Sequence, residues 1–357
     1  MISKKILIIN PGSTSTKIAI YESENAVFLK NLHHDNDELD ALKSIDEQFK
    51  FRKDLIINEI SNAGYAVEDL DLIVARGGLL KPIESGIYEV NDAMVNDLIN
   101  AKRHHASNLG ALIANEISKT KPGLKSYIAD PVVVDEMQDV ARYSGHPNFN
   151  RVSIFHALNQ KAIARSYAQS LGKNYEDLNL IVVHMGGGIS VGAHCKGKVI
   201  DVNQALDGEG PFSPERSGTL PIGDVVKAAF SGDYTLDEML KMIVGKGGMT
   251  AYMGTNDAYK VELDATAGNK DAEMMYKAMA YQVAKEVGAM ATVLKGKIDG
   301  IILTGGLAKS DYLNNFIKEN ISFIGDVAVF AGEDEMKSLA MNGNLLLKGE
   351  IDNKVYN

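Results

Sequence analysis

The most constraining feature of the sequence is a pair of apolar runs, Ile6 to Ile9 and Ile18 to Tyr21, that flank a short polar loop. Hydrophobic runs separated by turn-forming residues predict a β-hairpin. The loop contains almost only Gly, Pro and hydroxyl residues, and it ends in Lys17. Backbone N–H groups, hydroxyls and an ammonium group in one turn can surround an anion such as a phosphate. The alternative is a surface hairpin whose Ser and Thr residues merely suit a turn.

The same pattern recurs in the second half of the chain, from Leu180 to Ala193, around the glycines at 186–188. A third strand-like run follows each hairpin, at 26–32 in the first half and at 199–202 in the second. Each half therefore opens with a predicted β-meander whose first turn is rich in hydrogen-bond donors. We interpret the recurrence as a pseudo-repeat, and we expect the two turns to face each other across a cleft.

The length and composition indicate a two-domain α/β protein. A chain of 357 residues exceeds one typical hydrophobic core. Turn-forming residues concentrate at 145–148, so we place residues 1–150 with a C-terminal helix at about 335–357 in one domain and 151–334 in the other. A net charge of −10 argues against nucleic-acid binding. The single cysteine, Cys195, and a first apolar run too short for a signal peptide or membrane span predict a cytoplasmic protein.

Apolar periodicity and capping residues predict the remaining elements. The expected helices cover residues 37–64, 92–100, 107–119, 135–142, 156–171, 224–230, 236–244, 270–294 and 336–348. Further strands are expected at 70–75, 126–129, 299–304 and 327–330, and a short one before His156. Four strands run into glycine-containing turns, after Asn10, Ala75, His184 and Thr304. None of these turns carries the phosphate-loop or dinucleotide-binding glycine motif, which excludes both site classes at motif level.

The loop from Asn10 to Lys17 resembles the signature of the acetate and butyrate kinase (acetokinase) family, which belongs to the actin-like, sugar-kinase-like ATPase superfamily. Further segments match the family in order, at residues 76–78, 130, 155–156, 184–188, 215–218, 304–306 and 332–335. The resemblance covers almost the whole chain and is greatest toward butyrate and branched-chain fatty acid kinases. It implies two similar ribonuclease-H-like (actin-like ATPase) α/β domains, each with a mixed β-sheet flanked by helices, and a cleft between them.

The chain departs from acetate kinases at several positions. Pro11 stands where those enzymes tend to have a small residue, and Gly187 stands where they have an asparagine. Gln160 stands where they carry a second histidine, four residues after the first. Ile73 stands where they have an arginine, so we expect Arg76 to supply that charge from an adjacent position.

The family reaction transfers the γ-phosphoryl group of ATP to the carboxylate of a short-chain fatty acid, or makes ATP from an acyl phosphate. A carboxylate is already ionised at neutral pH, so no base has to deprotonate it. Catalysis then depends on positioning and on neutralising the phosphoryl oxygens, which suits arginine. The resemblance assigns catalytic roles to Arg216, Arg76, His156 and Asp130. The structural alternatives are a surface loop arginine, a structural histidine and a helix N-cap aspartate.

The resemblance also implies ATP or ADP and Mg²⁺ as cofactors. It assigns phosphate or nucleotide binding to Asn10, Gly12, Ser13, Ser15, Lys17, His184, Gly186, Gly187, Gly188, Asp257, Gly305, Gly306 and Leu307. On the metal side it implies Asn10, Asp130, Asp334 and Glu335. Mg²⁺ takes few protein ligands and keeps water, and which of the carboxylates at 333–335 lies nearest the metal stays open. The dipole at a helix start favours the same carboxylates without any metal.

Three other functions compete with a butyrate kinase. An acetate or propionate kinase of the same family differs only in the acid that it prefers. A sugar kinase needs a general-base carboxylate near the acceptor hydroxyl, for which only Asp130 would serve. A non-metabolic actin-like or chaperone-type ATPase would couple hydrolysis to assembly, but the chain has no segment that resembles a polymerisation insert or a peptide-binding domain.

The expected partners are a short-chain fatty acid or its acyl phosphate and ATP or ADP, with no nucleic acid and no membrane. Members of the family form dimers, so we expect a homodimer or a higher homo-oligomer. The final helix and the alanine-rich helix at 270–294 are the expected interface elements.

Overall fold

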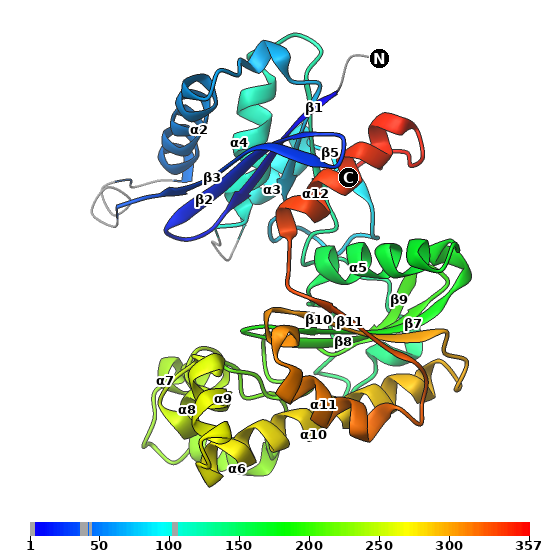
Figure 1. Ribbon diagram of the computed structural model, residues 1–357. Coiled ribbons are helices and arrows are strands. Elements are labelled where there is room, and N and C mark those ends of the chain that lie inside the picture. The colour runs from blue at the N-terminus through cyan, green and yellow to red at the C-terminus, as the bar shows by residue number, and fades with distance from the viewer. Residues whose placement is uncertain (1–3, 36–41, 43–44, 102–105) are drawn as a thin grey trace. The chain divides into compact units, whose positions relative to one another are not determined.

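A computed structural model describes residues 4–35, 42, 45–101 and 106–357 of the chain (Figure 1). The chain divides into two compact units, which we call unit 1 (residues up to Val134 together with Asp334–Asn357) and unit 2 (Asp135–Glu333). The division at Val134 lies before the turn-forming residues at 145–148. Residues from 135 onward belong to unit 2 because Gln138 N donates to Ile200 O at 3.0 Å and the Glu136 carboxylate pairs with Lys161.

Unit 1 is built on a six-stranded mixed sheet in the order β3-β2-β1-β4-β6-β5. Its strands are β1 (Lys5–Pro11), β2 (Ser15–Glu22), β3 (Asn25–His33), β4 (Leu72–Arg76), β5 (Ile87–Glu89) and β6 (Lys125–Ala129). The first three strands form the predicted antiparallel meander, whereas β1, β4 and β6 run parallel to one another. The carboxyl ends of β1, β4 and β6 therefore meet at one edge of the sheet.

Helices cover both faces of this sheet (Figure 1). The helical elements are α2 (Ile45–Asn62), the 3₁₀ turn η1 (Val67–Asp69), α3 (Asp92–Ile99), α4 (Asn108–Ser118) and α12 (Glu335–Lys348). Leu7 and Ile9 pack with α2 and α4 in one core, whereas Ile6 and Val74 lie against Gly343 of α12. Burial on both faces explains why β1 reads as a continuous apolar run rather than an alternating one. The predicted start of α2 at Asp37 lies outside the described residues.

Unit 2 repeats the strand order of unit 1. Its strands are β7 (Asn179–Met185), β8 (Ile189–Cys195), β9 (Lys198–Val202), β10 (Gly300–Gly305) and β11 (Val327–Ala331). The order β9-β8-β7-β10-β11 corresponds to β3-β2-β1-β4-β6, with an antiparallel meander followed by parallel strands. The pseudo-repeat predicted from the two hairpins is thus present in the structure.

The helical elements of unit 2 lie on both faces of its sheet. They are η2 (Asp139–Arg142), α5 (Ala157–Ser170), η3 (Tyr175–Asp177), α6 (Ile222–Ala229), α7 (Leu236–Ile243), α8 (Gly248–Met253), α9 (Ala258–Thr266), α10 (Lys270–Val293), η4 (Gly306–Lys309) and α11 (Asp311–Ile321). On one face α5 packs on Leu180 and Val182, and on the other α10 and α11 pack on Ile181 and Val183. Short helices α8 and α9 were not predicted, because their glycine-rich surroundings hide the helical periodicity.

Two predicted elements are wrong. The helix expected at 135–142 is reduced to the single 3₁₀ turn η2, because the Asp135 carboxylate accepts from Met137 N and from the Arg142 guanidinium. Side-chain acceptors of this kind compete with helical backbone bonds. The strand expected before His156 is also wrong, because residues 151–154 have no regular structure. No helix among the described residues has both the length and the hydropathy needed to cross a bilayer.

Candidate active site

The first hairpin turn in unit 1 has an ordered backbone and an exposed tip. Asn10 of β1 lies opposite Lys17 of β2, and Gly12 N donates to Ser15 O at 2.7 Å to close the turn. Ser13, Thr14 and Lys17 are exposed, whereas Asn10 is buried. The turn therefore presents hydroxyl, amide and ammonium donors from a fixed backbone, which is the arrangement that an anion cradle needs.

Arg52 of α2 holds this turn from the protein interior. Its Nη1 donates to Gly12 O at 2.8 Å, Ser15 O at 3.0 Å and Thr16 Oγ1 at 3.0 Å, and its Nη2 donates to Ser13 O at 2.8 Å. The side chain is only 1% exposed, and burial lowers the pKa of Arg52 to about 10. Because the guanidinium draws the carbonyl oxygens of the turn inward, it fixes the backbone and places a positive charge beneath the tip.

His34 completes the support of the turn. Thr16 Oγ1 and His34 Nε2 are 2.8 Å apart, and both side chains are buried. The contacts of the fully buried Thr16 hydroxyl, among the described residues, are Arg52 Nη1, which can only donate, and His34 Nε2, so the hydroxyl proton is directed to an unprotonated His34 Nε2. Burial and the nearby Arg52 charge lower the pKa of His34 to about 4. The histidine is an acceptor in the folded protein at neutral pH.

Asn10, Arg76 and Glu335 meet at the carboxyl edge of the unit 1 sheet. Asn10 Nδ2 donates to Glu335 Oε2 at 2.6 Å, and Arg76 Nη1 lies 3.0 Å from Glu335 Oε1. Ile73 is fully buried within β4, whereas Arg76 at the end of the strand reaches the edge. The positive charge at this edge of the sheet is therefore that of Arg76, three residues after Ile73.

The three consecutive carboxylates at 333–335 have three different environments. Glu333, in unit 2, lies near His184, with Oε2 3.1 Å from His184 Nε2. Asp334 caps α12, since its Oδ1 accepts from Lys337 N at 2.9 Å. Only Glu335 joins Asn10 and Arg76. Asp334 therefore has the capping contact that a helix-start carboxylate makes, and Glu335 is the carboxylate beside the first hairpin.

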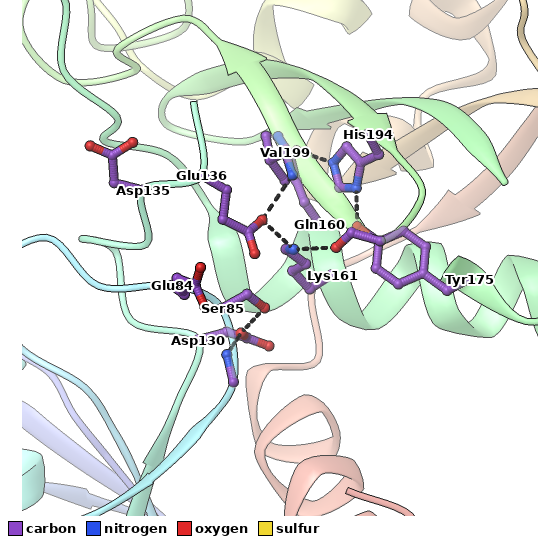
Figure 2. Close-up of polar contacts among 12 residues, drawn as sticks. Glu84, Ser85, Asp130, Asp135, Glu136, Gln160, Lys161, Tyr175, His194 and Val199 are labelled. Atoms are coloured by element: carbon purple, nitrogen blue, oxygen red, sulfur yellow. Dashed lines mark hydrogen bonds and ion pairs between the residues drawn. The ribbon is translucent and has the colours of Figure 1, made fainter. Parts of the chain in front are cut away.

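Asp130 follows β6 at the same edge, but it is almost completely buried (1% exposed). Its Oδ1 accepts from Ser85 Oγ at 2.6 Å and from Gly86 N at 2.8 Å (Figure 2). The backbone φ of Asp130 is +39°, which is uncommon for a non-glycine residue and recurs at functional sites. No helix follows Asp130, so the N-cap alternative is wrong.

In unit 2 the glycine turn between β7 and β8 is tied to Arg216. Gly186 N donates to Gly188 O at 2.9 Å, and Ser213 Oγ donates to Gly187 O at 2.6 Å. The Arg216 guanidinium lies so close to Gly188 that a Cβ there would overlap it. Arg216 Nη1 donates to Ala205 O at 2.5 Å, and burial lowers the pKa of Arg216. Arg216 is thus a packed part of the turn, not a surface loop residue.

His156 and His184 are stacked beside this turn. Their ring centroids are 3.8 Å apart with an interplanar angle of 12°. His184 Nδ1 lies 2.7 Å from Asn159 Oδ1, and His156 Nδ1 lies 2.9 Å from Ser190 Oγ. His184 is fully buried at the end of β7, whereas His156 is partly exposed at the start of α5. His184 orients the turn, and His156 is the more accessible of the two.

Gly305 and Gly306 share the edge that carries the turn at 186–188. Thr304 pairs with His184 in the parallel β7–β10 ladder, and Gly305 has a φ of +91° that places it against the Met185 backbone. A side chain at 305 would collide there, so glycine is required. Leu307 follows in η4 and is half-buried. Parallel strand ends with backbone accessible are the usual place for a nucleotide in such folds.

Asp257 lies apart from that group. Its carboxylate caps α9 by accepting from Lys260 N at 3.1 Å, and it is exposed. The neighbouring Asn256 Nδ2 donates to Glu215 Oε1 at 2.5 Å, and Glu215 precedes Arg216. The segment is therefore linked to the Arg216 loop through Asn256.

The metal-side residues form no dense carboxylate cluster. Among the described residues, no group of three or more His, Cys, Asp or Glu side chains could hold a metal ion. Mg²⁺ is usually held by one or two carboxylates together with phosphate oxygens and water. Asn10 and Glu335 are in contact through the Asn10 Nδ2–Glu335 Oε2 hydrogen bond, and the remaining oxygen atoms of the amide and the carboxylate are of the type that fits that requirement.

Comparison with known proteins decides the family. The model of the acetokinase family matches residues 137–331 of the chain. Butyrate kinase 2 of Clostridium acetobutylicum is 55% identical over 353 residues, which cover 99% of each chain. The chain belongs to the acetokinase family. A probable butyrate kinase of Phocaeicola vulgatus is 52% identical over 352 residues, again 99% of each chain.

The fold of this acetokinase is also found in a protein whose structure has been solved. The crystal structure of Porphyromonas gingivalis acetate kinase superposes with a TM-score of 0.81, covering 97% of this chain and 100% of that chain at 19% identity. The predicted class, an α/β fold with two mixed sheets flanked by helices, is confirmed.

Sequence motifs missed several residues of the candidate site in this acetokinase. Arg52, Ser213, Asn159 and Gln160 contact the predicted residues but lie outside the motifs. A signal for Arg52 was present, because Phe49, Arg52, Ile56 and Ile60 fall on one helical face. A charged residue in an apolar stripe indicates a buried contact that needs a partner.

The packing of Arg216 on the glycine turn predicts a difference between two neighbouring substitutions. Gly188→Ala places a methyl group on the guanidinium, whereas a Cβ at Gly187 comes no closer than 3.5 Å to Glu215. We expect Gly188→Ala to lower kcat by about 100-fold, because a displaced charge loses transition-state contacts of a few kcal/mol. Gly187→Ala, the matched control, should stay within about threefold of the unsubstituted enzyme. Equal losses in both variants would contradict the role of the Arg216 contact.

The low pKa of His34 predicts acid sensitivity of unit 1. The unfolded chain binds a proton at His34 near pH 6.5, whereas the folded chain does so only near pH 4. The free energy of unfolding therefore falls as the pH drops through this window, by about 2 kcal/mol at pH 5 relative to pH 7. Urea titrations at the two pH values measure this change. His34→Gln, which keeps an acceptor for Thr16, should remove most of the difference, and an unchanged pH dependence would contradict the assignment.

Proposed function

We propose that the protein is a butyrate kinase, which transfers a phosphoryl group between ATP and butyrate or a related short-chain acid to form an acyl phosphate. Membership of the acetokinase family makes it a kinase with a carboxyl group as acceptor. The observation that carries the choice of butyrate is the 52–55% identity, over 99% of the chain, to proteins named as butyrate kinases. The reaction is reversible, because both acyl phosphate and ATP are activated phosphoryl donors.

The acceptor needs no general base, since its carboxylate is ionised at neutral pH. Catalysis is then in-line positioning and neutralisation of charge on the transferring phosphoryl group. The Arg216 guanidinium, held by Gly188 and by Ala205 O, is the main positive charge of unit 2 for this task. Its planar fork presents two parallel N–H donors to two oxygens of one group, a fixed geometry that the single ammonium of a lysine does not supply.

In unit 1 the first hairpin binds phosphoryl oxygens. Ser13, Ser15, Lys17 and the Gly12 backbone supply donors, and the buried Arg52 adds positive potential beneath them. Arg76 supplies the charge that acetate kinases place at the position of Ile73. Its ion pair with Glu335 holds its guanidinium at the edge of the sheet.

Mg²⁺ would be held on the protein side by Asn10 and Glu335 through their side-chain oxygen atoms, with Asp130 in a supporting role. When bound, Mg²⁺ neutralises phosphate charge and orients the transferring group. Of the consecutive carboxylates at 333–335, Glu335 is favoured over Asp334 because Asp334 already caps α12. Asp130 holds the segment at Ser85 and Gly86, and its burial argues against its acting as a base for an alcohol acceptor.

In unit 2 the nucleotide phosphates lie against the turn of Gly186, Gly187 and Gly188, which His184 orients. The base and ribose of the nucleotide lie along Gly305, Gly306 and Leu307, with Asp257 on the ribose side. His156 donates a hydrogen bond to the transferring phosphoryl group. The exposed position of Gly306 and the partial exposure of His156 support these assignments. The single cysteine supports a cytoplasmic location.

A substrate profile tests the proposed function. The chain is incubated with ATP, Mg²⁺ and acetate, propionate, butyrate, isobutyrate or isovalerate, and the acyl phosphate is trapped with hydroxylamine. We expect the highest kcat/KM for butyrate or isobutyrate, with acetate lower by about 10-fold to 200-fold per methylene step in a fitted pocket. A preference for acetate or propionate would replace the butyrate assignment, and no hydroxamate with any acid would reject carboxylate kinase activity.

We also propose a homodimer, with α6 and α7 as the interface. Both helices contain no buried residue. Ile222 and Val226 of α6 and Phe230 at its C-cap recur at a spacing of four residues with 78%, 51% and 89% exposure, and Leu236 and Leu240 of α7 have the same spacing and are also exposed. The final helix, α12, is a poorer candidate than expected, because its apolar residues pack on β1 and β4 in unit 1. Contiguous exposed apolar surface is typical of protein interfaces.

The dimer predicts a mass of twice 38.7 kDa in sedimentation equilibrium. Val226→Glu with Phe230→Glu on α6 should give a monomer of unchanged far-UV circular dichroism, because two carboxylates cannot be buried at the interface. The control is the double substitution Lys318→Glu with Asn320→Glu on α11, which should leave the dimer intact. A wild-type monomer at micromolar concentration would rule the interface out.

A further inference from the structure

A chain of hydrogen bonds runs from His156 into the interior of unit 2. His156 Nδ1 lies 2.9 Å from Ser190 Oγ of β8, and Ser190 Oγ lies 2.8 Å from Gln160 Nε2 of α5. Gln160 Oε1 lies 2.9 Å from His194 Nε2, and His194 Nδ1 lies 2.7 Å from the Tyr175 hydroxyl. Ser190, Gln160 and His194 are fully buried, and Figure 2 shows Gln160, His194 and Tyr175 in sequence. We call the chain of Ser190, Gln160, His194 and Tyr175 the buried relay.

The direction of the relay is fixed at Gln160. Its Nε2 also donates to the Ser190 backbone carbonyl at 3.0 Å. A carbonyl oxygen can only accept, so the amide nitrogen must face Ser190 and the amide oxygen must face His194. A flipped amide would place two oxygen acceptors against each other in a buried site. The orientation of every other proton in the relay follows from this one contact.

On the interior side the Gln160 oxygen requires a proton on His194 Nε2. His194 is then neutral and unprotonated at Nδ1, where it accepts the Tyr175 O–H. Complete burial, together with the charges of Lys161 and Arg165, holds the pKa of His194 well below its usual value. Lys161 is itself fixed, since its Nζ contacts Glu136 Oε2 at 2.6 Å and Gly197 O at 2.7 Å. The inner end of the relay is therefore neutral and static.

On the outer side the contacts of the fully buried Ser190 hydroxyl, among the described residues, are Gln160 Nε2, which can only donate, and His156 Nδ1, so the hydroxyl proton is directed to His156 Nδ1. That nitrogen accepts, and neutral imidazole then carries its proton on Nε2. The stacked His184 ring keeps His156 in the plane that this bond requires.

We propose that Ser190, Gln160, His194 and Tyr175 are positioning residues that hold His156 as the neutral tautomer protonated on Nε2. This tautomer offers an N–H donor, and not a lone pair, to a phosphoryl oxygen. The consequence for catalysis rests on the proposed function, in which His156 contacts the transferring group. The tautomer itself is a property of the folded chain and does not depend on that function.

Gly192 supplies independent support for the relay. A Cβ at Gly192 of β8 would lie 2.5 Å from Gln160 Oε1 and 3.2 Å from His194 Nε2. Gly192 has no positive φ, so the backbone does not require glycine at this position. A side chain at position 192 is excluded because atoms of the relay occupy the space that it would need. Gly192→Ala therefore disturbs the relay by moving the end of a flexible side chain, at little cost to the fold.

The test is a measurement of histidine tautomers by long-range ¹H–¹⁵N NMR on the full-length protein labelled at histidine nitrogens. The His156 signals are assigned by their loss in His156→Asn. We expect Nε2 protonated and Nδ1 unprotonated in the unsubstituted chain at pH 8. Gln160→Met, which keeps the volume but removes donor and acceptor, should raise the Nδ1-protonated tautomer to a share comparable with the other. The kcat should fall about tenfold, with the KM for ATP changed by less than about twofold.

Gly192→Ala should show the same tautomer change, and it serves if Gln160→Met does not fold. Tyr167→Phe is the matched control, because it removes a tyrosine hydroxyl from α5 that lies outside the relay and contacts Asp299 O at 3.4 Å. That variant should leave the tautomer and kcat unchanged.

A proton on His156 Nδ1 in the unsubstituted chain, or an unchanged tautomer in both relay variants, would overturn the proposal. A tautomer change without loss of kcat would overturn its link to catalysis. Absence of acyl phosphate formation by the unsubstituted chain would instead reject the proposed function and leave the tautomer result standing.

Discussion

Parallel pairing of β1 with β4 and of β7 with β10 is the constraint on which both halves of the candidate site depend. Because parallel strands end at the same sheet edge, side chains far apart in sequence are brought together there. In unit 1 this edge joins Asn10 to Arg76, and in unit 2 it joins His184 to Gly305. The antiparallel hairpin that precedes each parallel pair supplies the donor-rich turn. The repeated strand order therefore produces two comparable donor-rich edges from one topology.

Buried polar groups hold each turn in place. Arg52 and His34 fix the first turn in unit 1, and Ser213, Arg216 and Asn159 fix the second with its histidines in unit 2. Such groups cost stability unless their hydrogen bonds are made, since desolvation disfavours their charged forms. The lowered pKa values of Arg52, His34, His194 and Arg216 all reflect this burial. A turn fixed before the substrate arrives needs little reorganisation during phosphoryl transfer.

Much of this fold could be predicted from local sequence, because strand and helix periodicity is a local property. The two meanders, the helix at 92–100 that Asn91 caps and the final helix follow from residues within one or two turns. The expected helix at 135–142 failed because Asp135 accepts from Met137 N and Arg142 and because Glu136 bonds Val199 and Lys161, partners that are distant in sequence. The same long-range contacts place the division between the units at Val134 and not at the turn-forming residues near Gly145.

The sequence by itself determined which residue types reach the site and in which order, because the turn motifs are contiguous. It determined the family for the same reason. Only the tertiary structure decided how those residues are partnered. The carboxylates at 333–335 are adjacent in the chain, yet one meets His184, one caps a helix and one meets Asn10. Arg52 and Gln160 became part of the site only through packing, because local periodicity can indicate that a side chain is buried but does not identify a hydrogen-bond partner tens of residues away.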